Sequence, residues 1–308
     1  MSRQLYDILR DIVGAMRIRQ DEPMKNHTTF RVGGPARYFV SPADASELAA
    51  VLDACRRDGS PWFILGNGSN LLVSDQGFPG TVVDMGRGFT SIRTEGEKVF
   101  ADSGLLLSQI ARKACETGLS GLEFAAGIPG SLGGAVVMNA GAYGSEMKDV
   151  LESVRVLTPE GKERRIPAEE LELGYRTSAV QKNGYVVLGA VFSLKPAPRE
   201  EIRARMDELA AARREKQPLE YPSGGSTFKR PEGYFAGKLI QDAGLKGFRI
   251  GDAQVSEKHC GFVINRGQAL AADVMAVCRC VSDTVYRQTG IRLEMELKTL
   301  GDFPEERP

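Results

Sequence analysis

One segment restricts the fold more than any other: residues 127–144 read GIPGSLGGAVVMNAGAYG. Its glycines and small side chains leave the backbone free to approach another group closely and to adopt positive φ angles. A second glycine-rich segment, residues 65–74, reads LGNGSNLLVS and directly follows the apolar run PWFI. Glycine turns at the end of a strand place several backbone N–H groups around an oxyanion, usually a phosphate. Each loop taken alone is explained as well by glycines that make turns and pack helices.

Neither segment carries a standard nucleotide-binding motif. LGNGSN lacks the third glycine of a Rossmann fingerprint, and no G-x-x-x-x-G-K-[ST] sequence occurs in the chain. Two glycine loops about sixty residues apart favour instead one long cofactor held at two points, such as a pyrophosphate and a ring system. The alternative, in which the glycines serve only turns and packing, stays open at this point.

The charge balance argues against nucleic-acid and membrane partners. The chain has 40 basic and 40 acidic side chains in 308 residues, so it presents no basic field to a phosphate backbone or an anionic membrane. No window approaches the ~18 apolar residues of a membrane span, and the charged N-terminus is unlike a signal peptide. We expect a cytoplasmic protein that binds small molecules, and we expect a monomer.

The cysteines and histidines do not suggest a metal site. The five cysteines form no Cys-x-x-Cys pair, and four lie among apolar residues, where a free thiol packs as a small hydrophobe. The two histidines, His27 and His259, are not near a cysteine pair. A zinc centre is therefore not expected.

Hydrophobic spacing divides the chain into successive α+β regions. A helix at residues 41–59 is expected to begin with Ser41 as N-cap and Pro42 at its first position, and to stop at Gly59. Apolar positions predict a helix at residues 271–288 and, by alternation, a strand at residues 291–301. The expected domains are residues 1–85, 86–197 and 198–300, followed by a tail at 301–308.

Seven segments resemble, in order, the signature segments of the UDP-N-acetylenolpyruvoylglucosamine reductase family. They are NHTTFRVGGPARYFV, LGNGSNLLVSDQGFPGTVV, GIPGSLGGAVVMNAGAYG, YRTS, GGSTFKRPEGYFAGKLIQDAGLKG, VSEKHCGFVIN and LEMELKTLG. Seven segments in one order, from residue 26 to residue 301, make a specific resemblance. The tyrosine-bearing insertion of some members is missing, so the chain resembles the shorter subtype.

The resemblance implies a fold and a reaction. The fold is α+β: an FAD-binding fold of the vanillyl-alcohol-oxidase/PCMH type, made of two α+β subdomains, plus a C-terminal α+β substrate domain. The implied enzyme is a UDP-N-acetylmuramate dehydrogenase that uses NADPH to reduce the enolpyruvyl ether of UDP-N-acetylglucosamine. Its product, UDP-N-acetylmuramate, is a cytoplasmic precursor of peptidoglycan, which implies roles in cell-wall biogenesis, cell shape and cell division.

The resemblance also assigns the cofactor site. One loop would cradle the FAD pyrophosphate through its backbone N–H groups: Gly66, Asn67, Gly68, Ser69 and Asn70. The other would line the flavin: Gly127, Ile128, Pro129, Gly130, Gly133, Gly134, Asn139, Gly141 and Ala142. Some relatives in the wider fold attach FAD through His or Cys in these loops. This chain has neither residue there, so a noncovalent flavin is expected.

Three residues match the family's catalytic positions: Arg176 in GYRTS, Ser226 in GGSTF and Glu296 in LEMEL. Reduced FAD would deliver the hydride from N5, and Ser226 would supply the proton. Arg176 is a permanent forked cation suited to the substrate carboxylate and to the negative charge that builds beside it. Periodicity alone cannot choose between Glu294 and Glu296, and the family pattern favours the second.

Three further residues are expected to bind the substrate: Lys229, Arg230 and His259. Lys229 is equally consistent with a solvated loop position, and His259 with a structural hydrogen-bonding role. Arg230 stands where some relatives have asparagine. The rival functions are another PCMH-type FAD oxidase or dehydrogenase, and a nucleotide-binding protein without catalytic activity.

Overall fold

The computed structural model describes residues 4–303. Its residues group into two compact units, each built from several chain segments. The first comprises the chain up to Arg19, Tyr38–Asn67 and Gly80–Arg213; the second comprises Gln20–Arg37, Gly68–Pro79 and the chain from Arg214 onward. The domain limits expected at residues 85, 197 and 300 stay a prediction, and residues 304–308 of the expected tail lie outside the described residues.

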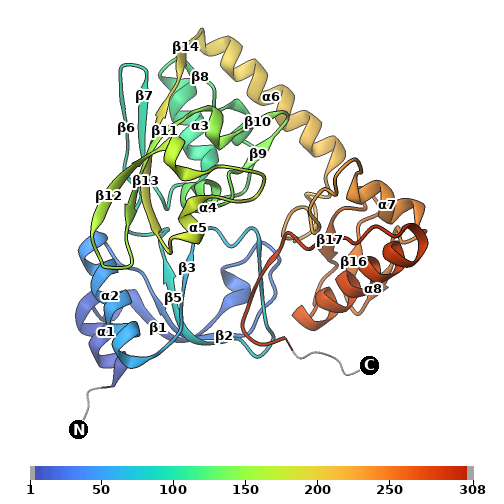
Figure 1. Cartoon of the computed structure of the whole chain (residues 1–308), viewed down its shortest axis with the longest axis horizontal. Coiled ribbons are helices and arrows are strands. Elements are labelled where there is room, and N and C mark those ends of the chain that lie inside the picture. Colours follow the sequence, from blue (N-terminus) through green and yellow to red (C-terminus); the bar gives the residue numbers. More distant parts are fainter. Residues whose placement is uncertain (1–3, 304–308) are drawn as a thin grey trace. The chain divides into compact units, whose positions relative to one another are not determined.

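The first sheet has four strands in the order β1–β2–β5–β3, and β3 runs parallel to β5. The bounds are Ile18–Pro23 for β1, Pro35–Val40 for β2, Trp62–Leu65 for β3 and Phe78–Asp84 for β5. Helices α1 (Leu5–Val13) and α2 (Ala45–Asp58) contact each other, as the blue ribbons of Figure 1 show. Leu9 and Leu48 from these helices pack with Val83 of β5 in one buried core.

The expected cap of α2 is wrong. Asp44, and not Ser41, is the N-cap, because its extended backbone lets its carboxylate accept the Glu47 N–H at 2.9 Å. Ser41 instead donates its hydroxyl hydrogen bond to Asp84 at 3.0 Å. The expected stop is confirmed, since Gly59 ends the helix in the left-handed conformation.

The second sheet has five antiparallel strands in the order β12–β11–β13–β7–β6. The bounds are β6 Ile92–Glu95, β7 Lys98–Asp102, β11 Leu151–Leu157, β12 Glu163–Pro167 and β13 Val186–Ser193. The helices of this region are α3 Leu107–Glu116, α4 Leu132–Val137 and α5 Ala179–Lys182. α3 and α4 supply buried residues to the core on this sheet, and β14 (Lys195–Pro196) pairs with β8 (Leu119–Ser120).

Residues 185–192 read YVVLGAVF, and all but the first belong to β13. The run is apolar because its side chains pack into two different hydrophobic cores. Val187 and Phe192 pack with α3 and α4, whereas Val186 and Leu188 pack with α1 and α2. The pairing register between β11 and β13 shifts near Arg155, and such an irregularity changes which face the following side chains take. A strand buried in this way cannot show polar alternation.

The second unit is built around α8 (Ala271–Thr289). α7 (Ala236–Asp242) packs on it, as does the small antiparallel sheet β15–β16–β17 (Figure 1). The strand bounds are β15 Arg249–Ile250, β16 Ala253–Val255 and β17 Val263–Asn265. The apolar face expected for α8 is confirmed: Val274, Val277, Cys278, Val281 and Val285 are buried. Burial raises the pKa of the Cys278 thiol to about 12, so this cysteine stays protonated.

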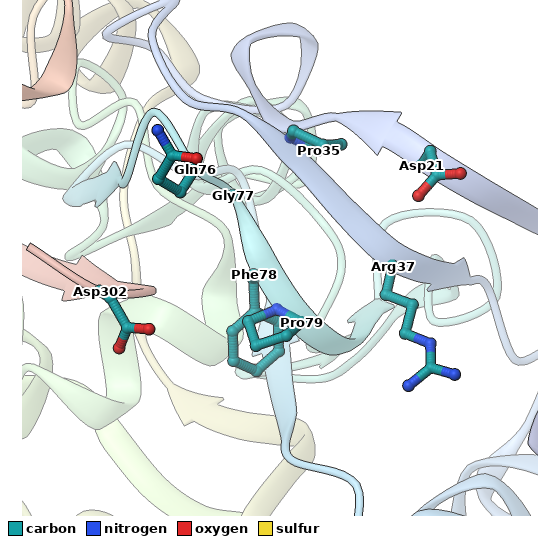
Figure 2. Close-up of a pocket in the computed structure, with 8 residues that line it drawn as sticks. All are labelled: Asp21, Pro35, Arg37, Gln76, Gly77, Phe78, Pro79 and Asp302. Atoms are coloured by element: carbon teal, nitrogen blue, oxygen red, sulfur yellow. The ribbon is translucent and has the colours of Figure 1, made fainter.

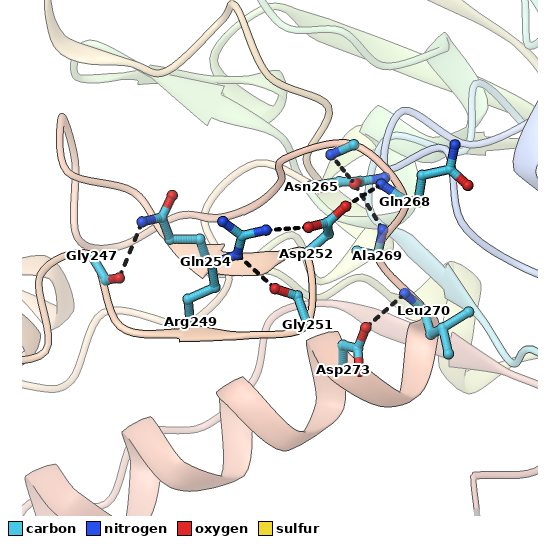
Figure 3. Close-up of polar contacts among 11 residues, drawn as sticks. Gly247, Arg249, Gly251, Asp252, Gln254, Asn265, Gln268, Ala269, Leu270 and Asp273 are labelled. Carbon is cyan, nitrogen blue, oxygen red and sulfur yellow. Dashed lines mark hydrogen bonds and ion pairs between the residues drawn. The ribbon is translucent and has the colours of Figure 1, made fainter.

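Polar contacts fix the beginning of α8. The Asp75 carboxylate accepts the backbone N–H groups of Ala271 and Ala272 at 2.8 and 2.9 Å. In the preceding loop, Asp252 accepts the Gln268 N–H at 2.8 Å and pairs with Arg249 (Figure 3). The Gln268 hydrogen bond, followed by Arg249, lowers the pKa of Asp252. The helix start is thus held by Asp75, which is 196 positions from Ala271 in the sequence, and by Asp273 of the helix itself, which accepts the Leu270 N–H at 3.1 Å.

The strand expected at residues 291–301 is mostly wrong. Only β18 (Lys298–Leu300) is a strand, paired in parallel with β4 (Leu71–Val73). Met295 forms an isolated antiparallel bridge to Phe228. Leu293, Leu297 and Leu300 are buried, but Met295 and Glu296 are both half-buried. The expected alternation therefore holds only in part, and the segment changes its partner between Met295 and Lys298.

Within residues 4–303, the remaining elements are one long helix, a short hairpin and five 3-10 helices. The long helix α6 spans Arg199–Lys216, and its Ile202 and Leu209 are buried. The hairpin strands β9 and β10 are Gly141–Ala142 and Ser145–Glu146. The 3-10 helices are η1 Ala15–Arg17, η2 Met24–Asn26, η3 Glu123–Ala125, η4 Met147–Asp149 and η5 Ala168–Leu171.

Candidate functional site

The two glycine loops meet within the first unit. The Asn67 side-chain amide donates a hydrogen bond to the Pro129 carbonyl at 2.6 Å. Gly66 packs against Ser131 so closely that an added Cβ would collide with the Ser131 hydroxyl oxygen. Segments sixty-two positions apart in the sequence therefore form one surface, as expected of loops that hold two parts of one ligand.

This surface contains polar atoms that the protein leaves without a partner. The hydroxyls of Ser103 and Ser131 are buried and form no hydrogen bond within the described residues. A buried hydroxyl without a partner is costly unless a ligand or water satisfies it. The close packing at Gly66 and these hydroxyls fit a bound group rich in hydrogen-bonding atoms, such as FAD.

The segment 127–144 forms a helix that the sequence did not predict. Helix α4 begins after Ser131, and the Gly133 N–H donates to the Ser103 carbonyl at 2.8 Å. A Cβ at Gly133 would lie 3.3 Å from the Ser103 Cβ, tighter than almost all such contacts. Small residues here let the helix approach β7, and the glycine content concealed the helical signal.

Asn139 has a structural role in addition to any contact with a flavin. It is buried with a φ of +41°, a conformation that asparagine tolerates better than most residues. Its amide donates to Glu146 at 2.6 Å and to the Gly174 carbonyl at 3.2 Å, and its oxygen accepts the Lys148 N–H at 3.0 Å. The side chain therefore links the glycine-rich segment to the turn that carries Arg176.

Arg176 occupies a strained position in that turn. Gly174 and Thr177 exchange backbone hydrogen bonds at 3.1 and 3.3 Å, which leaves Tyr175 and Arg176 as the two central residues. Arg176 has a φ of +57°, where a type II turn ordinarily takes glycine or asparagine. Strain of ~1–3 kcal/mol is found where a side chain must be held in a functional place. The Arg176 guanidinium lies over the Tyr175 ring, 5.0 Å from its centroid.

Within the second unit, the backbone next to Ser226 pairs with the backbone of Glu296. The Glu296 N–H donates to the Thr227 carbonyl at 2.9 Å, and the Lys229 N–H donates to the Glu294 carbonyl at 2.8 Å. Segments from GGSTF and LEMEL, about seventy positions apart, are therefore adjacent. Ser226 itself is exposed.

The structure distinguishes the two glutamates. The Glu294 side chain is 72% exposed and forms an ion pair with Lys229. Glu296 is half-buried, and its carbonyl accepts the Asn70 side-chain amide at 3.1 Å. Because β4 and β18 are parallel, the segments that precede them lie at the same end of the pair. These segments are the GNGSN loop and the Glu296 segment.

Gly68 supports this loop from the other side. It has a φ of +59°, and an added Cβ would collide with the His27 carbonyl and lie 3.0 Å from the Thr28 Cα. The Thr29 N–H donates to the Gly68 carbonyl at 3.2 Å. Because the NHTT segment packs directly against the loop, only glycine fits at this position.

The three expected substrate residues have unequal surroundings. Lys229 pairs with Glu294, and the Arg230 guanidinium lies over the exposed Phe235 ring, 4.0 Å from its centroid. His259 accepts the Gly261 N–H on Nδ1 at 3.1 Å and packs edge-on against Phe262. Burial lowers the pKa of His259. Its Nδ1 therefore has the structural role that the sequence left open.

A pocket of 270 Å³ in the second unit contains none of these residues. It is lined by Asp21, Pro35, Arg37, Gln76, Gly77, Phe78, Pro79 and Asp302 (Figure 2). Among residues 4–303, no group of three or more His, Cys, Asp or Glu side chains could hold a metal ion. None of the helices in the described part of the chain is both long and apolar enough to span a membrane.

Comparison with known proteins identifies the family. "UDP-N-acetylenolpyruvoylglucosamine reductase, C-terminal domain" matches residues 217–300, and "FAD binding domain" matches residues 36–167. The UDP-N-acetylenolpyruvoylglucosamine reductase of Agathobacter rectalis is 54% identical over 296 residues, which cover 92% of this chain and 94% of that protein. The chain belongs to the UDP-N-acetylenolpyruvoylglucosamine reductase family.

Two further comparisons agree. The reductase of Lachnoclostridium phytofermentans is 51% identical over 306 residues, covering 98% of this chain and 99% of that protein. The crystal structure of the reductase (MurB) from Thermus caldophilus has a TM-score of 0.80 at 39% identity, covering 92% of this chain and 100% of that one. The expected fold class, an FAD-binding fold of the vanillyl-alcohol-oxidase/PCMH type with a C-terminal α+β domain, is confirmed.

Proposed function

We propose that this chain reduces the enolpyruvyl ether of UDP-N-acetylglucosamine to UDP-N-acetylmuramate in the cytoplasm, as a monomer, with noncovalent FAD and with NADPH as reductant. Family membership supports the reaction class, and the match to the FAD-binding domain supports the cofactor. The observation that carries the assignment of residues is the pairing of the Ser226 and Glu296 segments beside Asn70. A proton donor and a carboxylate are thereby adjacent to the predicted pyrophosphate loop.

The protein must bind the substrate, stabilise the charge that develops and deliver one proton. Bound FAD supplies the hydride. Arg176 binds the substrate carboxylate through its forked donors and stabilises the negative charge on the carbon beside it. The Asn139 hydrogen bond to the Gly174 carbonyl anchors the turn that carries Arg176.

Ser226 donates the proton to the second alkene carbon. A serine hydroxyl is a weak acid, so it acts only against a strongly basic carbon and in a fixed position. Glu296 contributes negative charge and hydrogen-bonding capacity at the same place, and its backbone is held by Thr227 and Asn70. Lys229 and Arg230 bind the diphosphate as cations, and His259 is a further contact for the substrate.

The two half-reactions test this proposal. NADPH should bleach the flavin absorbance of the purified holoenzyme, and the UDP-linked enolpyruvyl sugar should restore it. Bleaching without recovery on addition of that sugar would identify another flavin oxidase or dehydrogenase. Protein that neither contains nor takes up FAD would be a nucleotide-binding protein without this activity. NADH in place of NADPH measures the preference for reductant.

A serine variant tests the proton donor. Ser226→Ala should still be reduced by NADPH and should lose ~10²- to 10⁴-fold in turnover, the usual contribution of general acid catalysis. Ser223→Ala is the matched control, because Ser223 lies in the same loop and its backbone carbonyl, not its hydroxyl, accepts the Thr29 hydrogen bond. Equal turnover of the two variants would refute the role of Ser226.

A further inference from the structure

Arg213 is a half-buried cation beside the glycine-rich segment that the family resemblance places along the flavin. It lies near the end of α6 and donates a hydrogen bond from Nη1 to the Gly127 carbonyl. A Cβ at Gly127 would lie 3.3 Å from the Arg213 Cδ, so the side chain packs directly on this loop. The contact is far from local, because the two residues are 86 positions apart.

The surroundings of the Arg213 guanidinium are unusual for a half-buried charge. Within residues 4–303 it forms no ion pair, and the Gly127 carbonyl is the acceptor of its hydrogen bond. Burial is the first cause of its lowered pKa, and the nearby Tyr143 partly opposes this. A guanidinium carries five N–H donors and stays protonated. A half-buried guanidinium loses part of its hydration, so the arrangement favours a negative ligand beside its remaining donors.

The position of Arg213 narrows the choice of anion. The GNGSN loop is the segment assigned to the FAD pyrophosphate, whereas Gly127 belongs to the segment assigned to the flavin ring. Hydride transfer from NADPH leaves one negative charge on the ring, because two electrons arrive with one proton. Positive charge near the ring is a recognised means by which proteins tune a flavin.

We propose that Arg213 faces the flavin ring and stabilises the negative charge of the reduced cofactor, while its hydrogen bond to Gly127 positions the loop. This inference rests on the proposed use of FAD. Arg213 is a positioning and potential-setting residue, and it has no part in the transfer of the proton to the substrate.

The midpoint potential of bound FAD tests the proposal. It is measured by equilibration of the holoenzyme with a redox dye, so it requires neither NADPH nor the sugar substrate. Arg213→Met should lower the ratio of reduced to oxidised FAD at least tenfold at a given potential, which is ~30 mV for a two-electron couple. Arg213→Lys keeps the charge and should recover most of this shift. Arg214→Met is the matched control, because Arg214 is the exposed neighbour on the same helix and should leave the potential unchanged.

The affinities for FAD and for riboflavin distinguish the two anions that Arg213 could face, the pyrophosphate and the reduced flavin ring. Titration of the apoprotein with FAD and with riboflavin should show similar, modest losses for Arg213→Met, since both ligands contain the ring. A loss confined to FAD, with an unchanged potential, would place the arginine at the pyrophosphate and overturn the proposal. Unchanged potential and unchanged affinity would leave Arg213 with a packing role only, which also overturns it. If Arg213→Met does not fold, Arg213→Gln, which also removes the charge, replaces it in the same measurement of potential.

Failure of this inference is distinguishable from failure of the proposed function. A wrong substrate would abolish the second half-reaction and leave the potential difference between Arg213→Met and Arg214→Met intact. A protein that binds no FAD would refute the proposed function before Arg213 is considered.

Discussion

The contact between Gly66 and Ser131 provides a sharp test of how the two glycine loops meet. In Gly66→Ala the new Cβ would collide with the Ser131 hydroxyl oxygen, while the Ser131 Cβ would be 3.3 Å away. The obstruction is therefore one atom on a buried side chain. Overpacking of this kind costs ~1–3 kcal/mol, so Gly66→Ala should lower the free energy of unfolding by that amount.

Removal of the obstructing atom should reverse the effect. The Ser131 hydroxyl is buried without a hydrogen-bond partner, so Ser131→Ala alone should be neutral or stabilising. The double variant should recover most of the loss, because a Cβ at 3.3 Å requires only a small shift. The expected coupling free energy is at least ~1 kcal/mol, within the range for residues in contact.

Urea unfolding of the four apoproteins, followed by far-UV circular dichroism, measures this cycle. FAD titration of the same proteins should show weaker binding for Gly66→Ala than for the wild type. Gly134→Ala is a contrast for stability, because its added Cβ would lie 3.8 Å from the same hydroxyl and should not destabilise. Additive effects of Gly66→Ala and Ser131→Ala would refute the contact between these two residues.

The remaining predictions concern four other positions. Gly68→Ala should destabilise the loop and abolish FAD binding. A residue with a Cβ costs ~1–2 kcal/mol at this φ, and the new Cβ would collide with the His27 carbonyl. Retention of flavin by the purified variant would contradict this. Asp75→Ala removes the acceptor of two backbone N–H groups of α8. It should therefore lower the free energy of unfolding by ~0.5–2 kcal/mol, as the loss of an N-cap does. An unchanged urea midpoint would contradict this. Arg176→Lys keeps the charge but loses the forked donor, so turnover should fall substantially, and a wild-type rate would show that charge alone suffices. Burial lowers the pKa of His259 below its usual value, so the unfolded chain binds a proton that the folded protein does not. Stability should therefore decline as pH falls below about 6.5, and the decline should be shallower in His259→Gln if this residue causes it.

Local features of the fold could be predicted because they depend on neighbouring residues. The helix expected at 271–288 is present, and its apolar positions form its buried face. Gly59 ends α2 as expected. Predictions failed where two local signals competed. Asp44 rather than Ser41 caps α2, and the glycines of segment 127–144 concealed α4. The segment 291–301, expected as one strand, instead pairs with two different partners.

The amino-acid sequence alone determined the chemistry that this chain carries: two glycine loops outside any Rossmann fingerprint, and ordered segments with one arginine, one serine and two glutamates. Only the tertiary structure decided which of these groups meet. It joined Asn67 to Pro129, and it separated Glu296 from the exposed Glu294. It also placed the half-buried Arg213 against the Gly127 carbonyl. Periodicity records which face of an element is buried, whereas contacts between residues 60 to 90 positions apart depend on how whole elements pack.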